Sequence, residues 1–247
     1  MDISLLKSKL LYYSWSIHFR LQQIFHEKRT GAAIVMFHHV GDDVSNDIID
    51  SCKCTNAEFR SFVELIKSNR WVVSFDEMLD KVQQGENNLV VISFDDVPDN
   101  FYLNAYPLLK ENKLPFILYV TTGFIDKPGF LSSSQLEILS KDPLCTIGAH
   151  TMSHPTLSKK SVNLDVEIRD CKKRIEAIIK KEIRHFAYPF GVPPSINMDV
   201  VKYTSLCNQY NTACSTFPGL VYKRSLKSLF ILPRIHHKLY IKKFNHK

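Results

Sequence analysis

The sequence predicts an α/β fold in which parallel strands alternate with helices and close into a distorted (β/α) barrel. Short apolar runs alternate with helical patterns along most of the 247 residues, which is typical of parallel βαβ units. No linker rich in Gly, Ser or Pro interrupts this alternation, so one domain is expected over residues 31–247. Seven or eight such units fit a closed or nearly closed barrel better than an open sheet.

The first strand is expected at 32–37, a fully apolar run that follows the break at Thr30-Gly31 and ends in His38-His39. A helix at 56–69, capped at Thr55 or Asn56, comes next. A strand at 71–75 and a helix at 76–84, started by Asp76, complete this part.

The same alternation then repeats to the end of the chain. Further strands are expected at 89–94, 115–120, 145–149, 185–188, 212–215 and 230–235. Further helices are expected at 99–112, 132–140, 163–181 and 195–208.

Residues 1–30 form a separate N-terminal extension, in which 4–26 read as an amphipathic helix. One interpretation is a helix packed on the domain. The other is a helix lying on a membrane surface, because basic residues together with Trp and Phe suit that plane. The extension shows no secretory pattern, and no stretch reaches transmembrane length. We therefore expect a cytoplasmic protein, with peripheral contact at the inner face of the membrane under the second interpretation.

Composition narrows the classes of partner. The chain is 45% hydrophobic and 23% charged, an ordinary globular balance. Its net charge of +7 favours anionic partners or simply reflects a lysine-rich surface. No arginine-rich or aromatic-interleaved basic stripe appears, so no nucleic-acid partner is expected. The six cysteines are expected to be reduced, as in a cytosolic protein.

Polar clusters follow several of the predicted strands. Asp95-Asp96 ends one strand, and His150, followed four residues later by His154, ends another. Two imidazoles and one carboxylate make an open site for a catalytic divalent metal, and a second carboxylate beside it is placed to act as a base. The spacing therefore predicts metal-assisted hydrolysis at the carboxyl ends of the strands.

The other strand ends carry further polar groups. They are His38-His39, Tyr188-Pro189-Phe190-Gly191 and Arg234-Ile235-His236-His237.

Taken in order, these motifs resemble those of the polysaccharide deacetylases with a NodB homology domain, a family like carbohydrate esterase family 4. The resemblance spans roughly residues 33–236. The segments that carry it are Met36-Phe37-His38-His39-Val40, Ser93-Phe94-Asp95-Asp96, His150-Thr151-Met152-Ser153-His154 and Phe186-Ala187-Tyr188-Pro189-Phe190-Gly191.

The resemblance implies a distorted (β/α) barrel that hydrolyses an N-acetyl or O-acetyl group of a sugar. It places Asp96, His150 and His154 around a divalent ion, most simply Zn, with Co, Ni or Mn as alternatives. Asp95 becomes the general base. The metal and a backbone N–H near Phe190 would stabilise the oxyanion.

The remaining roles that the resemblance implies are less specific. The general acid is a histidine of the last strand, and either His236 or His237 fits. Tyr188 belongs to the third motif and is expected beside the substrate. His38 and His39 line the sugar pocket or cap the strand.

Two departures from the family pattern stand out. Val97-Pro98 follows the Asp pair where many members have Gly. Ala187 stands where the third motif often carries an Arg that pairs with the catalytic Asp. Arg234, at another strand end, is the candidate to supply that charge.

The predicted function is a metal-dependent deacetylase acting on an N-acetylated saccharide of bacterial surface-glycan biosynthesis. The substrate is a lipid- or nucleotide-linked intermediate under the cytoplasmic interpretation. The alternative is a non-catalytic carbohydrate-binding relative, which the departures at Val97 and Ala187 allow but which the retained Asp and His residues disfavour.

Overall fold

A computed structural model describes residues 31–42 and 52–244 of the chain. The predicted amphipathic helix at 4–26 lies outside these residues, so its packing and any membrane contact stay predictions. The division at residue 30 is likewise a prediction.

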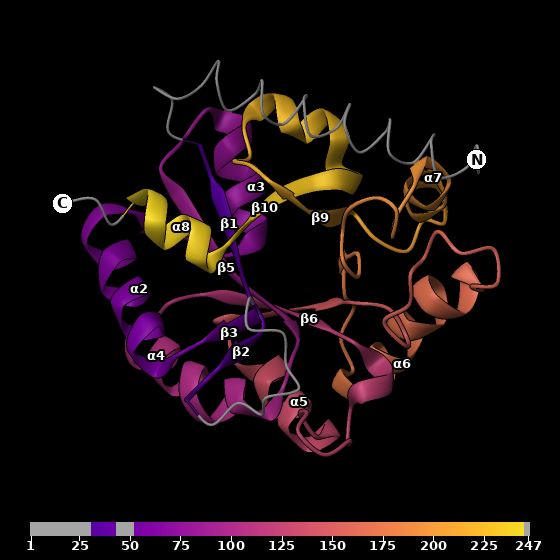
Figure 1. The fold of residues 1–247 in the computed structure, drawn as a ribbon, viewed down its shortest axis with the longest axis horizontal. Helices are drawn as coiled ribbons and strands as arrows, with labels where there is room; N and C mark the ends of the chain where they lie inside the picture. Colours follow the sequence, from indigo (N-terminus) through magenta and orange to yellow (C-terminus); the bar gives the residue numbers. More distant parts are fainter. Residues whose placement is uncertain (1–30, 43–51, 245–247) are drawn as a thin grey trace.

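Parallel strands form a closed barrel, as predicted (Figure 1). The first described strand lies beside the last and also beside a strand from the middle of the sequence, which closes the ring. Around the ring, the strands are β1 (Ala33–Phe37), β5 (Leu89–Asp96), β6 (Phe116–Val120), β7 (Cys145–Ala149), β8 (His185–Ala187), β9 (Thr212–Pro218) and β10 (Leu232–His236).

Side chains alternate between two apolar layers because successive residues of a strand point to opposite faces. One layer fills the barrel, and Tyr119 takes so much of it that a Cβ on Gly148 would lie 2.9 Å from its ring. The inner layer includes Ala32, Ile34, Val91, Ile117, Tyr119, Ala187, Cys214 and Leu232. The outer layer, under the helices, includes Val35, Phe37, Ile92, Phe94, Leu118, Phe186 and Ile235.

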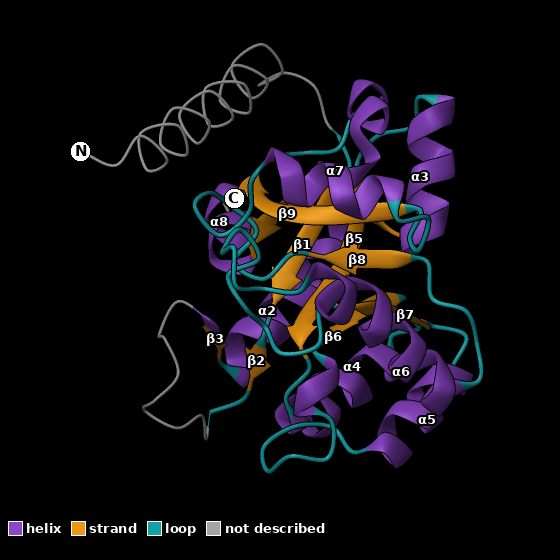
Figure 2. Cartoon of the chain, turned by 90° about the vertical axis from the view of Figure 1, so that its right-hand side faces the viewer, coloured by secondary structure: helices purple, strands orange, loops and turns teal. Residues whose placement is uncertain are grey.

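Helices surround the barrel (Figure 2). Their starts follow capping chemistry: Thr55 and Glu58 form a capping box at the first of them, and Ser132 and Gln135 form another. The helices are α2 (Asn56–Asn69), α3 (Phe75–Gln84), α4 (Tyr106–Glu111), α5 (Ser133–Lys141), α6 (Cys171–Ile179), α7 (Met198–Leu206) and α8 (His237–Phe244).

Two predicted helices begin with a wider, π-helical segment. These segments are η2 (Phe101–Ala105), which precedes α4, and η4 (Asp165–Asp170), which precedes α6. The 3₁₀ segments are η3 (Thr122–Phe124) and η5 (Lys223–Ile231).

Several local expectations were wrong. The strand expected at 71–75 is only β4 (Trp71–Val72), because Ser74 caps α3 and starts it one residue before Asp76. The helix expected from 99 begins there, with two α-helical residues before η2, and the helix expected from 163 begins at Leu164. The helix expected from 195 begins only at Met198, three residues later. The pairing of β2 (His39–Val40) with β3 (Lys53–Cys54), the segment η5 and the helix α8 were not predicted.

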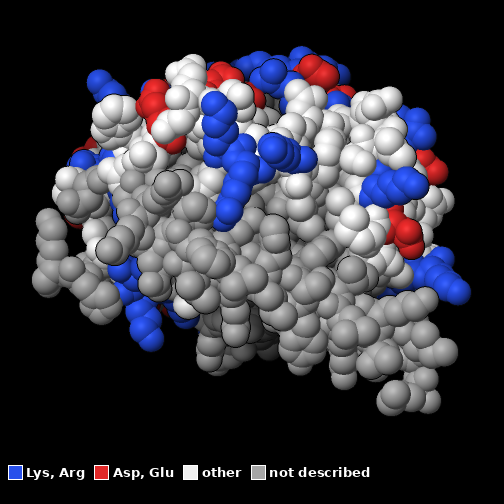
Figure 3. Space-filling view, turned by 90° about the horizontal axis from the view of Figure 1, so that it is seen from above, with Lys and Arg blue, Asp and Glu red and all other residues white. Residues whose placement is uncertain are grey.

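Charge and cysteine chemistry are unremarkable over the described residues. On the face in Figure 3, Lys and Arg side chains occur in several separate groups with Asp and Glu between them. All six cysteines are free. None of the helices within the described ranges is long and apolar enough to cross a bilayer.

Candidate active site

A buried ion pair crosses the barrel interior at the carboxyl ends of its strands. Arg234, on β10, donates from both terminal nitrogens to Asp95, on β5, at 2.6 and 2.7 Å. Its Nε donates to the Ser215 carbonyl at 3.0 Å, so every part of the guanidinium has a partner. Both side chains are almost fully buried. This two-point contact brings the expected charge to Asp95.

Burial alone would raise the pKa of Asp95. The charge of Arg234, the nearby His150 and the hydrogen bonds from Arg234 outweigh burial and hold this pKa well below its usual range. Asp95 is therefore an ionised carboxylate at neutral pH.

Three ligand atoms converge beside Asp95. Asp96 Oδ1 lies 3.8 Å from His150 Nε2 and 3.6 Å from His154 Nε2. Ligand atoms of these three residues all lie within 4.8 Å of one another, the only such group among the described residues. Two atoms that each lie about 2.1 Å from a tetrahedral ion are about 3.4 Å apart, so this spacing fits one small divalent cation.

His150 is prepared to be a ligand. Its Nδ1 donates to the Ala187 carbonyl at 2.8 Å, which fixes the tautomer and leaves Nε2 as an acceptor. Burial lowers the pKa of His150 to about 4, against the raising effect of Asp95 and Asp96. The neutral imidazole that a metal needs is therefore the form present at neutral pH. The donor set and its protonation both fit a Zn-type ion.

The loops that carry these ligands have left-handed backbone, which is uncommon for residues other than glycine. Asp96 ends β5 and Val97 follows it, with φ of 61° and 57°, and Thr151 and His154 follow β7 with φ of 71° and 59°. The φ of Val97 is one that Gly adopts without strain, so the substitution expected at this position has a backbone reason. Such strain clusters at functional sites.

Phe190 lies at the rim of the site. Its φ is 59°, its side chain is 52% exposed, and its ring packs edge-on against His154 at 4.8 Å. Gly191 follows with φ of 64°, and a Cβ there would come within 2.4 Å of the Thr216 backbone nitrogen. The turn that presents Phe190 therefore requires glycine at 191.

The structure does not bring two of the expected residues to the site. Tyr188 is fully buried, and its hydroxyl donates to the Phe230 carbonyl at 3.0 Å. His237 is fully buried, stacks on Phe37 at 4.9 Å, and its Nε2 lies 3.2 Å from the Lys53 carbonyl. Both point to the outer layer of the barrel, so their expected roles in catalysis find no support in their positions.

His38 and His236 share the inner face of their strands with Asp95, by the alternation along β1 and β10. The charge of His38 also acts on the Asp95 carboxylate. His39 is half-buried and accepts a hydrogen bond from Asn100 at 3.3 Å, an arrangement closer to a structural role than to a sugar contact. Strand alternation thus puts two further imidazoles on the inner face at the same end of the barrel.

Two contributing residues were missed in the sequence. Thr121 directly follows β6, and its hydroxyl donates to Asp96 Oδ1 at 3.0 Å. The strand-end rule that picked the other residues also applies to it. Glu167 accepts hydrogen bonds from the loop that carries His154, and no sequence signal separated it from other helix charges.

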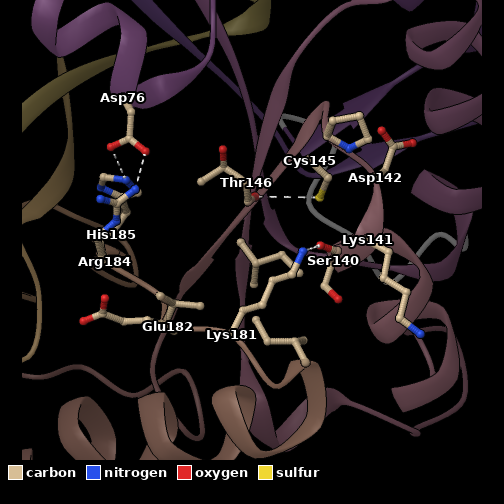
Figure 4. A pocket seen from close by; sticks show the side chains of 14 residues that line it. Asp76, Ser140, Lys141, Asp142, Cys145, Thr146, Lys181, Glu182, Arg184 and His185 are labelled. Atoms are coloured by element: carbon tan, nitrogen blue, oxygen red, sulfur yellow. Dashed lines mark hydrogen bonds and ion pairs between the residues drawn. The ribbon is translucent and has the colours of Figure 1, made fainter.

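A hollow of about 370 Å³ lies at the opposite end of the barrel (Figure 4). There Asp76 faces both Arg184 and His185, at 2.8 and 3.1 Å, while Lys181 donates to the Ser140 carbonyl. Every one of these groups has a protein partner.

The sequence is similar to that of a known protein family and of several known proteins. The family model described as "Polysaccharide deacetylase" matches residues 82–209. The poly-beta-1,6-N-acetyl-D-glucosamine N-deacetylase of Staphylococcus aureus (strain MRSA252) is 25% identical over 179 residues, covering 66% of this chain and 62% of the relative. The protein of the same name from Staphylococcus epidermidis is 30% identical over 171 residues, covering 62% and 58%. The chain thus spans less than two thirds of the length of these relatives.

Solved structures share the fold. A polysaccharide deacetylase from Bacillus cereus, BC0361, superposes with a TM-score of 0.73 at 22% identity, covering 87% of this chain and 69% of that one. IcaB from Ammonifex degensii gives a TM-score of 0.71 at 18% identity, covering 84% and 91%.

Proposed function

The chain belongs to the polysaccharide deacetylase family, and from that premise we propose that it is a metal-dependent hydrolase that removes the acetyl group of an N-acetylated amino sugar. The observation that carries this proposal is the ligand set of Asp96, His150 and His154 with an ionised Asp95 directly beside it. Metal-assisted hydrolysis needs this combination of an open metal site and a neighbouring base.

We infer the substrate class from the relatives. Those that match are named poly-beta-1,6-N-acetyl-D-glucosamine N-deacetylases, so an N-acetylglucosamine saccharide of bacterial surface-glycan assembly is our first candidate. A lipid- or nucleotide-linked saccharide is the second, because a net charge of +7 complements a pyrophosphate.

A divalent ion held by Asp96, His150 and His154 would polarise the acetyl carbonyl and acidify the attacking water. Asp95 accepts the proton of that water. Its Oδ2 lies 3.9 Å from His150 Nε2, which places the carboxylate at the edge of the ligand set. Arg234 holds both Asp95 oxygens, so the base is fixed in orientation before the substrate arrives.

The departing amine needs a proton donor. We assign this role to His236, because His237 is enclosed in the outer layer and His236 shares the inner face with Asp95. His38 is the second candidate, since it lies on the same face and its charge acts on Asp95. Comparing His236→Asn with His38→Asn separates the two, because only loss of the acid slows substrates with poor leaving groups more than substrates with good ones.

The test is acetate release from a panel of β-1,6-linked N-acetylglucosamine oligomers, nucleotide sugars and lipid-linked saccharides, using metal-loaded protein. We expect release from at least one class and its loss in Asp95→Asn. Protein that binds metal yet releases no acetate from any of them would favour the alternative, a non-catalytic carbohydrate-binding relative. Equal release by wild type and Asp95→Asn would contradict the assignment of the base.

A further inference from the structure

We propose that Glu167 is a positioning residue that holds His154 in ligating geometry and thereby sets the affinity of the site for its metal. This role rests on the proposed function, in that it takes Asp96, His150 and His154 as the metal ligands. Glu167 lies on η4, thirteen residues after His154 in the chain, and it is only 8% exposed.

One carboxylate binds two consecutive residues of the loop between the two histidines. Glu167 Oε2 accepts the backbone N–H groups of Met152 and Ser153, at 3.0 and 2.9 Å. Its Oε1 accepts the Ser153 hydroxyl at 2.7 Å. Hydrogen bonds to an ionised acceptor are about twice as strong as neutral ones, so three of them to one group anchor the loop firmly.

The opposite side of the loop is fixed by backbone contacts with the β6–α5 connection. Thr122 N–H donates to the Thr151 carbonyl at 3.0 Å, and Gly123 N–H donates to the Met152 carbonyl at 2.7 Å. The two segments are so close that a Cβ on Gly123 would lie 2.5 Å from the Met152 oxygen. The loop is therefore clamped between Glu167 and this connection.

The clamp matters because the loop is intrinsically unfavourable. Thr151 and His154 both have positive φ, and the His154 N–H depends on a bond to the Thr151 hydroxyl at 3.0 Å. Without an anchor, such residues relax toward ordinary backbone angles, since the left-handed region is sterically unfavourable for residues with a Cβ. His154 Nε2 would then leave the position 3.6 Å from Asp96 Oδ1. The buried His150, by contrast, directly follows β7 and is held by two bonds of its own, from its N–H to the Val120 carbonyl and from its Nδ1 to the Ala187 carbonyl.

The experiment measures metal affinity rather than catalysis. Zn²⁺ dissociation constants of wild type, Glu167→Ala and Glu167→Gln are determined by competition with a chromogenic chelator. Co²⁺-loaded samples report ligand geometry through their visible absorption. We expect Glu167→Ala to weaken binding about 10- to 100-fold and to change the Co²⁺ spectrum. Glu167→Gln should recover most of the affinity, because its carbonyl can accept both N–H groups while its amide donates to Ser153.

The matched control is Glu176→Ala. Glu176, on α6, also accepts a backbone N–H, that of Ile183 at 2.9 Å, but it contacts no part of the ligand loop. It should destabilise the fold without changing metal affinity by more than about twofold. Ser153→Ala, which removes only the Oε1 hydrogen bond, gives a milder variant should Glu167→Ala fail to fold; it should weaken binding a few-fold.

Wild-type metal affinity in Glu167→Ala, or in Ser153→Ala where the former does not fold, would overturn the positioning role alone. A wild-type protein that binds no divalent ion would overturn the proposed function as well. One metal titration of wild type and variants therefore distinguishes failure of the positioning role from failure of the proposed function.

Discussion

The two ends of the barrel carry the same three residue types in different states. At the carboxyl end, Asp95 meets Arg234 and His150; at the amino end, Asp76 meets Arg184 and His185. The Asp95 side chain is 2% exposed and that of Arg234 0%. At the amino end, the Asp76 side chain is 45% exposed and that of Arg184 49%.

The histidines differ in the same way. His185 uses both ring nitrogens, with Thr212 at 2.9 Å and Asp76 at 3.1 Å. His150 uses only Nδ1 and keeps Nε2 3.9 Å from Asp95, too far for a hydrogen bond. The hydrogen bond from His185 lowers the pKa of Asp76, as Arg234 does for Asp95, so a depressed carboxyl pKa does not distinguish the ends. The two ends differ instead in the burial of the ion pair and in the Nε2 of His150, which is left available to bind a ligand.

The largest expected difference is in activity. Asp95→Asn removes the base and should lower kcat for acetate release by about 10²- to 10⁴-fold. Asp76→Asn, the matched change at the amino end, should leave kcat within twofold. Steady-state kinetics of the metal-loaded proteins measure both, and comparable losses in the two variants would erase the functional contrast.

The next largest difference between the two ends is expected in their contributions to stability. Arg234→Met leaves Asp95 buried without a counter-charge and should lower the free energy of unfolding by about 3 to 5 kcal/mol. Arg184→Met breaks an exposed pair, and a loss of at most about 1 kcal/mol is expected. Urea unfolding followed by circular dichroism reports both values, and a similar loss for the two arginines would show that burial is not what separates the pairs.

Acid sensitivity should come from the carboxyl end. Burial, helped by the charges of His236 and Lys238, lowers the pKa of His237 to about 3. The folded state therefore binds fewer protons than the unfolded chain between about pH 6.5 and pH 3, and the stability present above this window is lost as pH falls through it.

This group contributes a slope of at most about 1.4 kcal/mol per pH unit. His237→Phe, which keeps a ring against Phe37, should flatten that slope in urea midpoints measured from pH 7 to 4. An unchanged slope would mean that His237 does not control acid unfolding.

The smallest effect is expected at Val97. Glycine would relieve left-handed strain of about 1 to 2 kcal/mol but would lose a buried side chain of about 1.5 kcal/mol. The free energy of unfolding of Val97→Gly should therefore lie within about 1 kcal/mol of the wild-type value, as measured by urea unfolding. A much larger loss would show that packing by Val97, and not the turn, shapes the loop after Asp95-Asp96.

Much of the fold follows from local patterns. The apolar runs at β1, β5, β6 and β7 are bounded by polar residues, and their alternation with helices specifies a parallel barrel. Capping chemistry also places α2 correctly. Local patterns do not specify which strands pair when the barrel closes. The pairing of β1 with both β5 and β10 depends on residues far apart in the sequence.

The site residues that lie at strand ends could also be predicted from the sequence. The proposed metal ligands and Asp95 lie at or just beyond strand ends that the barrel brings together. Strand alternation separates the two candidates that lie away from the site, Tyr188 and His237, from Ala187 and His236, which occupy the inward positions beside them. Glu167 was beyond such reasoning, because its partners are backbone N–H groups that only the folded loop presents.

The central claim is tested most directly by the metal stoichiometry and affinity of wild type, Asp96→Asn and Asp76→Asn, measured by titration with Zn²⁺ after chelator treatment. We predict one ion per chain in wild type and Asp76→Asn, and affinity at least about 10-fold weaker in Asp96→Asn. Absence of a stoichiometric ion in wild type, or equal affinity in all three proteins, would contradict the assignment of the metal site.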